Sequence, residues 1–241
     1  MVGLWGRIMG VPKGDAMTGA EMPYNVVGEP SGEPSGEPSE EAREEAWRAS
    51  NLPADELELA WRYAHGELQL YERRIRSLAA FGVGPAVGAW VRSRLEWMVE
   101  ERLSERPDGV LVLTITPEGD VGMALRDVAE APALRAESLV WDADGRLAGC
   151  DVAGSVWQVA DGEARMRDAG GLEVPRAAAD TFARDVLRTM GIEVREGGVS
   201  RGDAGDGELF VISDEHGVTG CEGASGPAVE KLELCFERLW G

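Results

Sequence analysis

The sequence predicts an α+β fold with two domains, a small helix-rich N-terminal domain and a larger strand-rich C-terminal domain. Between residues 39 and 104, apolar residues recur mainly at the three- and four-residue spacing of amphipathic helices. From residue 110 onward, short runs of strand composition alternate with turn sequences and two amphipathic helices. We place the small domain at residues 39–130 and the large domain at residues 131–241, after a tail of residues 1–38.

The tail is expected to be disordered. Residues 28–39 are three copies of Gly-Glu-Pro-Ser, and each copy carries a proline, a glycine and a negative charge. Such a repeat has no apolar surface to bury, so we expect it to stay extended and to serve only as a spacer. Met17 and Met22 are alternatives to Met1 as the first residue of the protein.

Four helices are expected in the small domain. Ser39, followed by two glutamates, suits the N-terminus of the first helix. Pro53 opens the second, because proline fits a first helical turn. Its apolar stripe would be Leu57, Ala60 and Trp61. The expected helices cover Glu40 to Arg48, Pro53 to Trp61, Leu70 to Gly82, and Val87 to Ser104.

The remaining elements are mostly short strands. A turn at Pro117–Asp120 joins the first two into a hairpin. Proline at Pro227 opens the last helix, and Gly191 ends the one before it. The expected strands are Val110–Thr116, Val121–Asp127, Ser138–Trp141, Gly154–Ala160, Ile192–Arg195 and Leu209–Ser213, and the two helices span Ala179–Met190 and Pro227–Trp240.

The charge balance excludes several classes of partner. The chain has 24 Lys and Arg against 44 Asp and Glu, a net charge of -20. Such a chain repels phosphate backbones and anionic lipid, so neither nucleic acid nor a membrane is expected as a partner. The longest uncharged run, Leu78–Val91, contains three glycines and a proline and is too short to span a bilayer. The apolar start, Met1–Val11, lacks the features of a signal peptide.

Cysteine and lysine usage add two constraints. The three cysteines, Cys150, Cys221 and Cys235, form no Cys-x-x-Cys pair, which favours a reducing cytoplasm and argues against structural zinc. Lys13 and Lys231 are the two lysines of the chain, and the other basic residues are arginine. Any chemistry that needs a lysine amine therefore has two candidates.

Several stretches, taken in order, resemble one enzyme family. From the N-terminus they read HGELQLYERRIRSLAAFG, VLVLTITPEGD, LVWDADGRLAGCDVAGSVWQVADG, LEVPRAAADTFARDVLRTMGIEVREGGVS, GELFVISDEHGVTG and GASGPAVEKLELCFERL. Their order and spacing over about residues 60–240 resemble the class IV aminotransferases. This fold-type-IV family includes branched-chain and D-amino-acid transaminases and 4-amino-4-deoxychorismate lyase. The resemblance implies two domains flanking a cleft, a dimer, and pyridoxal phosphate as the cofactor.

The resemblance also implies three groups around the cofactor, and this chain departs from each. The family's lysine precedes the Asp-x-x-Gly turn, where this chain has residues 128–138 without a lysine. The family's glutamate beside the pyridine nitrogen is replaced by Gly149 or Cys150, and Asp151 is the nearest acid. The two phosphate-binding loops read Arg176-Ala177-Ala178 and Ser213-Asp214-Glu215, so carboxylates stand where small hydroxyl residues are usual.

Two cofactor-binding remnants are expected from the resemblance. Arg76 aligns with the arginine that contacts the cofactor phosphate, and Ser213 keeps a hydroxyl in the second loop. The simpler interpretation of Arg76 is that, with Arg73 and Arg74, it forms a solvated charged face of one helix.

We therefore expect a divergent class IV aminotransferase-like protein without pyridoxal phosphate catalysis and with no cofactor. It would be a binding or regulatory pseudoenzyme, paired as a homodimer or as a heterodimer with a related subunit. The alternative is a pyridoxal phosphate-dependent aminotransferase or aminodeoxychorismate lyase acting on amino-acid-type substrates, which would require Lys231 in the site. A third possibility is an unrelated α+β domain.

Other constellations carry weaker signals. Asp214, Glu215 and His216 with Cys221 outline a nucleophilic site, although a polar loop beside a buried cysteine explains them more simply. His65 is interpreted as a turn residue. No metal site is expected, because the acidic turns at residues 142–145 and 203–208 lack the spacing of a calcium loop. The eight tryptophans indicate core packing or a subunit interface.

Overall fold

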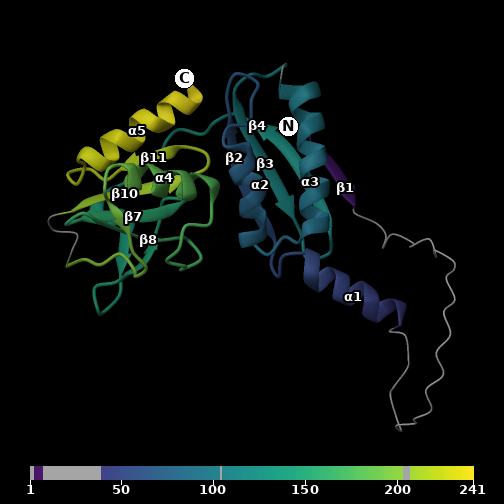
Figure 1. Cartoon of the computed structure of the whole chain (residues 1–241), viewed down its shortest axis with the longest axis horizontal. Helices are drawn as coiled ribbons and strands as arrows, with labels where there is room; N and C mark the ends of the chain where they lie inside the picture. The colour runs from purple at the N-terminus through teal and green to yellow at the C-terminus, as the bar shows by residue number, and fades with distance from the viewer. Residues whose placement is uncertain (1–2, 8–38, 104, 203–206) are drawn as a thin grey trace, which may run out of the picture.

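The computed structural model describes residues 3–7, 39–103, 105–202 and 207–241, whose strands form three sheets. A four-stranded sheet belongs to the N-terminal half, and a five-stranded and a two-stranded sheet belong to the C-terminal half (Figure 1). Each half also has its own buried hydrophobic clusters. Residues of both halves line the cavity described below.

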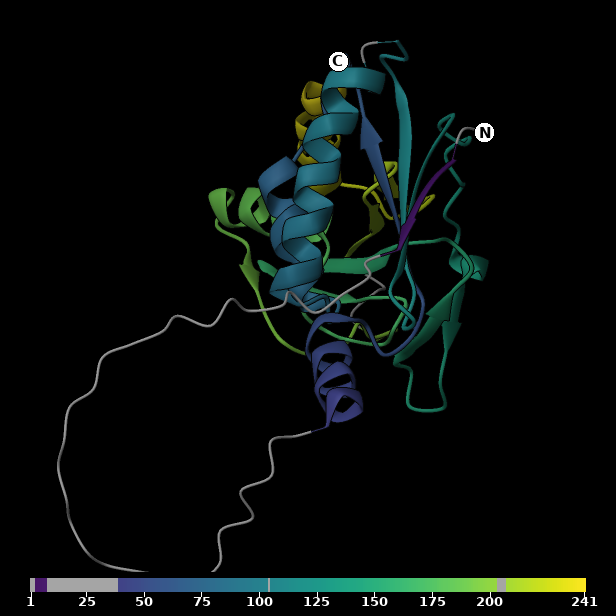
Figure 2. The same ribbon diagram turned by 90° about the vertical axis from the view of Figure 1, so that its right-hand side faces the viewer.

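The N-terminal sheet is antiparallel throughout and is covered on one face by helices (Figures 1 and 2). Its strand order is β1-β4-β3-β2, with β1 at Gly3–Arg7, β2 at Leu57–Tyr63, β3 at Gly109–Ile115 and β4 at Asp120–Arg126. The covering helices are α2 (Tyr71–Ala80) and α3 (Pro85–Met98), the latter continued by a π-helical turn at Val99–Leu103. Helix α1 (Glu40–Asn51) extends away from the body.

The strand β2 corrects the expected second helix, from Pro53 to Trp61. Leu59, Trp61 and Tyr63 are buried at alternate positions, and the strand pairs with β3 along its whole length. The stripe Leu57, Ala60 and Trp61 also fits helical spacing, so a run this short is ambiguous by periodicity alone. Pairing with an apolar neighbouring strand makes this segment a strand and not a helix.

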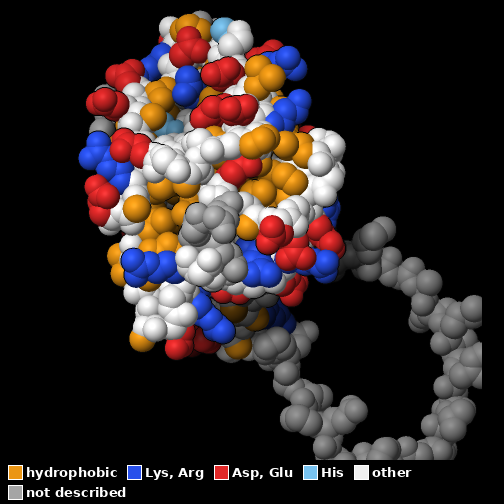
Figure 3. Space-filling view, turned by 90° about the vertical axis from the view of Figure 1, so that its left-hand side faces the viewer, with side chains coloured by type: hydrophobic (Ala, Val, Ile, Leu, Met, Phe, Trp, Pro, Cys, Tyr) orange, Lys and Arg blue, Asp and Glu red, His pale blue; other side chains and the backbone are white. Residues whose placement is uncertain are grey.

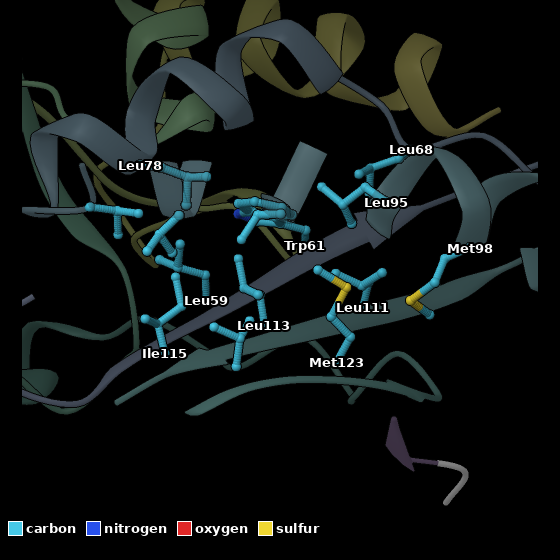
Figure 4. Packing of buried hydrophobic residues seen from close by; sticks show 14 of the residues in the cluster. Leu59, Trp61, Leu68, Leu78, Leu95, Met98, Leu111, Leu113, Ile115 and Met123 are labelled. Atoms are coloured by element: carbon cyan, nitrogen blue, oxygen red, sulfur yellow. The ribbon is translucent and has the colours of Figure 1, made fainter. Parts of the chain in front are cut away.

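The core of this half lies between the sheet and its helices (Figure 4). Trp61, Leu111 and Leu113 point from the strands toward the helices, and Leu78 and Leu95 meet them from α2 and α3. All five side chains are at most 1% exposed. Burial on this scale, at about 25 cal/mol per Å² of apolar area, is the main favourable contribution to folding here.

The C-terminal sheet is buried on both faces. Its order is β11-β10-β7-β8-β9, with β7 at Ser155–Ala160, β8 at Glu163–Arg167, β9 at Glu193–Val194, β10 at Glu208–Ser213 and β11 at Gly217–Gly220. The β8–β9 pair is parallel. Trp157 and Phe210 face α4 (Ala178–Thr189) and α5 (Pro227–Trp240), whereas Val156 and Val211 face the hairpin of β5 (Leu139–Trp141) and β6 (Leu147–Cys150).

Many predicted local signals are confirmed. The Ser39 side chain caps α1 by accepting a hydrogen bond from the amide of Ala42 at 3.2 Å. Gly191 follows α4 with φ +80°, and Pro227 opens α5. Strands β6, β8 and β11, of four to five residues each, were not predicted.

Part of the predicted tail is a strand. Gly3–Arg7 pairs with β4 along the edge of the N-terminal sheet. The remaining residues 8–38, with the Gly-Glu-Pro-Ser repeat, lie outside the described residues, as do Ser104, Asp203 and Asp206.

The surface mixes charges of both signs. Figure 3 looks onto the C-terminal half, where acidic and basic side chains are interspersed around hydrophobic groups. Among the described residues, no helix is both long enough and apolar enough to cross a membrane.

Candidate functional site

A cavity of about 510 Å³ lies between two sides. Strand β2 forms one side, and the start of β7 with the end of β10 forms the other. This volume is within the range of small-molecule sites, about 300–1,000 Å³. Apolar walls come from Leu59, Phe81, Val152 and Ile212. Gly154 lets β7 approach β10, because its φ is +134° and a Cβ there would collide with the carbonyl oxygen of Ile212. The described lining residues include seven carboxylates: Glu58, Glu130, Asp151, Asp168, Asp180, Asp214 and Glu215.

Asp214 follows β10 and closes the N-terminus of α4. Its Oδ1 accepts a hydrogen bond from the amide of Ala179 at 2.9 Å, and the amide of Ala178 also stabilises the carboxylate. Desolvation of the carboxylate raises the pKa of Asp214, a half-buried residue, and Arg74 and these amides act in the opposite direction. Unpaired amides and the helix dipole make a helix N-terminus an anion site. The chain supplies its own anion at this position.

Arg74 ties Asp214 to the N-terminal sheet. Its side chain is buried in α2, with Nη1 donating to the carbonyl of Arg62 at 2.6 Å and Nη2 to the carbonyl of Asp214 at 3.3 Å. The amide of Arg62 donates to the same Asp214 carbonyl at 3.0 Å. Burial lowers the pKa of Arg74 to about 10, against the opposing effect of Asp214, so the guanidinium stays charged at neutral pH.

Asp180, in the first turn of α4, is a second buried carboxylate. Trp157 Nε1 donates to its Oδ1 at 3.0 Å, and Ser155 Oγ donates to its Oδ2 at 2.8 Å. Burial raises its pKa to about 7; these two hydrogen bonds oppose the rise, and the charges of Asp214 and Asp168 add to it. Asp180 is therefore partly protonated near neutral pH, in contrast to an ordinary aspartate.

Ion pairs hold the rim of the cavity. Arg126 makes two 2.6 Å hydrogen bonds to Glu215, and these lower the pKa of that glutamate. Arg176 bonds Asp168 through Nε at 2.9 Å and lies over the ring of Phe81, 4.9 Å from its centroid. Such bidentate and stacked geometries are characteristic of arginine.

Of the two expected cofactor remnants, Ser213 lines the cavity and Arg76 does not. The Ser213 hydroxyl accepts a hydrogen bond from the amide of His216 at 3.0 Å. Arg76 is exposed and donates from Nε to the carbonyl of Glu72 in its own helix. Two other arginines of this helix reach the C-terminal half, Arg73 through the carboxylate of Asp185 and Arg74 through the carbonyl of Asp214.

The sequence held a signal for Arg74 and for Asp180. Arg74 precedes the buried Leu78 by four residues, so helical spacing places both on one face. Asp180 lies directly after Ala179 and three residues before Ala183, on the buried face of α4. A polar residue on the apolar face of a helix is informative, because burial of such a group requires a partner.

The weaker constellations do not assemble into a site. Cys221 packs with Leu134 and Cys150, while His216 lines the cavity, where burial lowers its pKa. His65 lies in a turn, as expected. No group of His, Cys, Asp or Glu within the described ranges has the arrangement of a metal site.

The residues present do not fit pyridoxal phosphate. Lys231 is exposed on α5 and does not line the cavity, and Lys13 lies outside the described part of the chain. The amides that open α4 already bind the carboxylate of Asp214. A phosphate placed there would meet a buried negative charge instead of free donors.

Comparisons with known proteins support the fold. 4-Amino-4-deoxychorismate lyase from Pseudomonas aeruginosa is 16% identical, with a TM-score of 0.58 over 85% of this chain and 96% of that one. A fold IV-transaminase from Curtobacterium pusillum is 15% identical, with a TM-score of 0.56 over 77% and 83%. The PLP-bound form of a hypothetical aminotransferase from Mycobacterium tuberculosis is 13% identical, with a TM-score of 0.54 over 77% and 87%.

No protein-family model matches the sequence, and neither does any curated protein. The structural likenesses nevertheless confirm the predicted α+β class and the resemblance of the fold to class IV aminotransferases and 4-amino-4-deoxychorismate lyase. At these identities the likeness concerns the fold, and the chemistry has to be argued from the site.

The role assigned to Arg74 predicts a large effect on stability. Arg74→Met should lower the free energy of unfolding by about 1–3 kcal/mol, because it removes the donor to the carbonyls of Arg62 and Asp214 and a favourable charge near Asp214. Arg76→Met, two residues along the same helix, should change it by less than about 0.5 kcal/mol. Urea denaturation of both variants measures the difference, and equal effects would contradict the assignment.

The raised pKa of Asp180 predicts a pH-dependent stability. The folded protein holds this proton up to about pH 7, against 3.8 for an ordinary aspartate, so the stabilisation is complete below about pH 4 and is lost as pH rises to about 7. Relative to Asp180→Asn, the wild type should lose up to about 4 kcal/mol over that range.

The measurement is urea unfolding at several pH values. Asp144→Asn, in the exposed turn between β5 and β6, changes the net charge equally and is the control. Parallel stability curves for the wild type and Asp180→Asn would show that Asp180 ionises normally.

Proposed function

We propose that this chain is a fold-type IV aminotransferase-like protein without pyridoxal phosphate catalysis, which acts as a binding or regulatory pseudoenzyme. The observation that carries the proposal is the carboxylate of Asp214, hydrogen-bonded to the first amides of α4. A side chain of the protein itself thus takes the place that the fold offers to a phosphate.

Electrostatics support this proposal. A phosphate at the α4 N-terminus would lie beside the half-buried Asp214 and close to the buried Asp180. Charges of one sign repel strongly where water is excluded, by several kcal/mol at about 4 Å with an effective dielectric constant of 20. Arg74, the nearby buried cation, is already engaged with backbone carbonyls.

Lysine placement points the same way. The described lysine, Lys231, lies on the exposed side of a helix whose apolar side packs on the C-terminal sheet. Bringing its amine to the cavity would require α5 to turn its buried residues outward. Under the proposal the chain retains the cleft for binding and pairs with itself or with a related subunit, the two partners that the resemblance implies.

A second candidate function is a pyridoxal phosphate-dependent aminotransferase or lyase acting on amino-acid-type substrates. The observation that favours it is the likeness to 4-amino-4-deoxychorismate lyase of Pseudomonas aeruginosa over 85% of this chain. This candidate needs a lysine that reaches the cofactor and a phosphate site free of Asp214.

One experiment separates the two candidates. Pyridoxal phosphate is titrated into the full-length protein, followed by visible absorbance, borohydride reduction and peptide mass spectrometry. We expect no saturable spectral change and no stoichiometric adduct. Because the chain has two lysines, the assignment of any adduct is direct. A stoichiometric adduct that is abolished by Lys231→Arg would refute the proposal and establish the second candidate.

A variant tests the observation that carries the proposal. Asp214→Ser removes the internal anion and leaves a small hydroxyl beside the α4 amides. It should bind inorganic phosphate measurably in calorimetry, whereas the wild type should not, provided that circular dichroism shows a folded variant. Equal phosphate binding by both proteins would mean that Asp214 does not block the site.

A further inference from the structure

We propose that a second pocket of the molecule binds a small organic monoanion, an oxyanion on an apolar body, through the guanidinium group of Arg62. The pocket has a volume of about 490 Å³ and lies between the end of β2 and the C-terminal end of α5. This volume is within the range of small-molecule sites. The pocket and the cavity both have His216 in their linings and share none of their other described lining residues. The inference therefore does not depend on what the cavity binds.

Arg62 is fixed at the junction of the two halves by its backbone. Its amide donates a hydrogen bond to the carbonyl of Asp214 at 3.0 Å, and its carbonyl accepts one from Nη1 of Arg74 at 2.6 Å. In strand β2 it alternates with the buried residues Trp61 and Tyr63, which face the helices of the N-terminal half. Because successive side chains of a strand point to opposite faces, the side chain of Arg62 leaves the sheet toward the C-terminal half.

This side chain stacks on an aromatic ring that is itself held in place. The guanidinium carbon of Arg62 lies 4.6 Å from the centroid of the Trp240 ring. That ring packs on Phe236, with a centroid distance of 5.4 Å, and on the backbone of Gly217, where a Cβ would come within 2.5 Å of it. A stacked guanidinium group uses its face, so the N–H groups along its edge stay free for hydrogen bonds. The stack therefore presents donors in a fixed position.

Arg62 differs from three other arginines of this region, because no carboxylate of the described residues pairs with it. Arg73, Arg126 and Arg176 each form an ion pair with an aspartate or a glutamate. Within the described ranges, the guanidinium group of Arg62 makes neither an ion pair nor a hydrogen bond, and its Nε is buried without a partner. Because Nε is covered, the terminal nitrogens are the donors that a ligand can reach. An oxyanion would supply the acceptors that this group lacks.

The surroundings of Arg62 limit the ligand to one negative charge. Glu233 and Glu237 of α5 also line the pocket, and both are exposed. Water and salt screen exposed carboxylates, but each further charge on a ligand is still repelled by both of them. His216 adds no positive charge near neutral pH, because burial lowers its pKa. A single guanidinium group therefore favours a monoanion over a dianion such as a phosphate.

The apolar walls indicate the rest of the ligand. Val218 of β11 and the rings of Phe236 and Trp240 line the pocket. An alkyl chain placed against these side chains removes apolar surface from water, which favours binding. An anion without such a chain would use the guanidinium group and leave the walls unused. We therefore expect affinity to increase with the length of a short alkyl chain.

The test titrates hexanoate and hexanesulfonate into the full-length protein at pH 8 by calorimetry. We expect saturable one-to-one binding of at least one of these monoanions, and the tighter of the two identifies the oxyanion as a carboxylate or a sulfonate. Hexyl phosphate and acetate are the comparisons. The phosphate carries two charges at this pH, because its second pKa is about 6, and acetate lacks the chain, so both should bind more weakly.

Two variants assign the binding to Arg62. Arg62→Met keeps an unbranched side chain beside the indole and removes the charge, so the monoanion should bind at least about tenfold more weakly. Arg238→Met removes the same charge from an exposed position of α5 that does not line the pocket. This control should bind as the wild type does.

A third variant tests the pocket in the opposite direction and does not depend on the folding of Arg62→Met. Glu237→Gln removes a negative charge from an exposed position that lines the pocket. It should tighten binding of the monoanion about two- to fivefold at low salt. Glu230→Gln, exposed on the same helix and outside the pocket, should change the affinity less.

Four results would overturn this inference. They are no saturable binding of either monoanion up to about 10 mM, tighter binding of hexyl phosphate, unchanged binding by Arg62→Met, and equal effects of Glu237→Gln and Glu230→Gln. None of them bears on the pyridoxal phosphate experiment. A stoichiometric adduct on Lys231 would refute the proposed function and leave this inference standing.

Discussion

The contact between Asp214 and the first turn of α4 is the interaction on which the rest of the structure depends. Its carboxylate satisfies amides that would otherwise be unpaired in a buried helix end. Its carbonyl accepts hydrogen bonds from the Arg62 amide and the Arg74 guanidinium. One residue thus joins β10 and α4 to β2 and α2, and so fixes both sides of the cavity. The same carboxylate occupies the amides that a phosphate would need at this helix N-terminus.

Arginine is the second constraint, because the two halves are held together mainly by guanidinium groups. Arg73 pairs with Asp185 between α2 and α4 at 2.8 Å, and Arg126 pairs with Glu215. A planar guanidinium group can donate two parallel hydrogen bonds to a carboxylate, or one to each of two carbonyls. The ammonium group of lysine is less suited to this geometry. A carboxylate also caps the last helix. Glu208, at the other end of β10, accepts hydrogen bonds from the first amides of α5. Arginines therefore link the two halves, and carboxylates close the N-termini of α4 and α5.

The sequence predicted most of the elements and, through the resemblance, the two loops that line the cavity, but not the hydrogen bonds between them. Hairpins, caps and amphipathic helices depend on local patterns, so the β3–β4 hairpin and the Ser39 cap could be predicted. The apolar residues of β2 fit both the helical and the strand period, so the predicted helix was wrong there. Pairing with β3 makes this segment a strand. The assignment of Arg76 to the cofactor stays a prediction from the resemblance, whereas helical spacing places Arg74 on the buried face of α2. That Asp214 bonds the α4 amides depends on residues 35 positions apart, which no local pattern reveals.

Two carboxylates of the cavity, Asp214 and Asp180, have pKa values that desolvation raises. Asp214 and Asp180 lie near the start of the same helix, yet their surroundings differ in kind. Asp214 is opposed by Arg74 and by helix amides, so its charge is balanced by the protein. Asp180 is opposed only by the hydroxyl of Ser155 and the indole of Trp157. The first carboxylate is therefore satisfied by a nearby cation and by helix amides, whereas the second is satisfied by neutral donors.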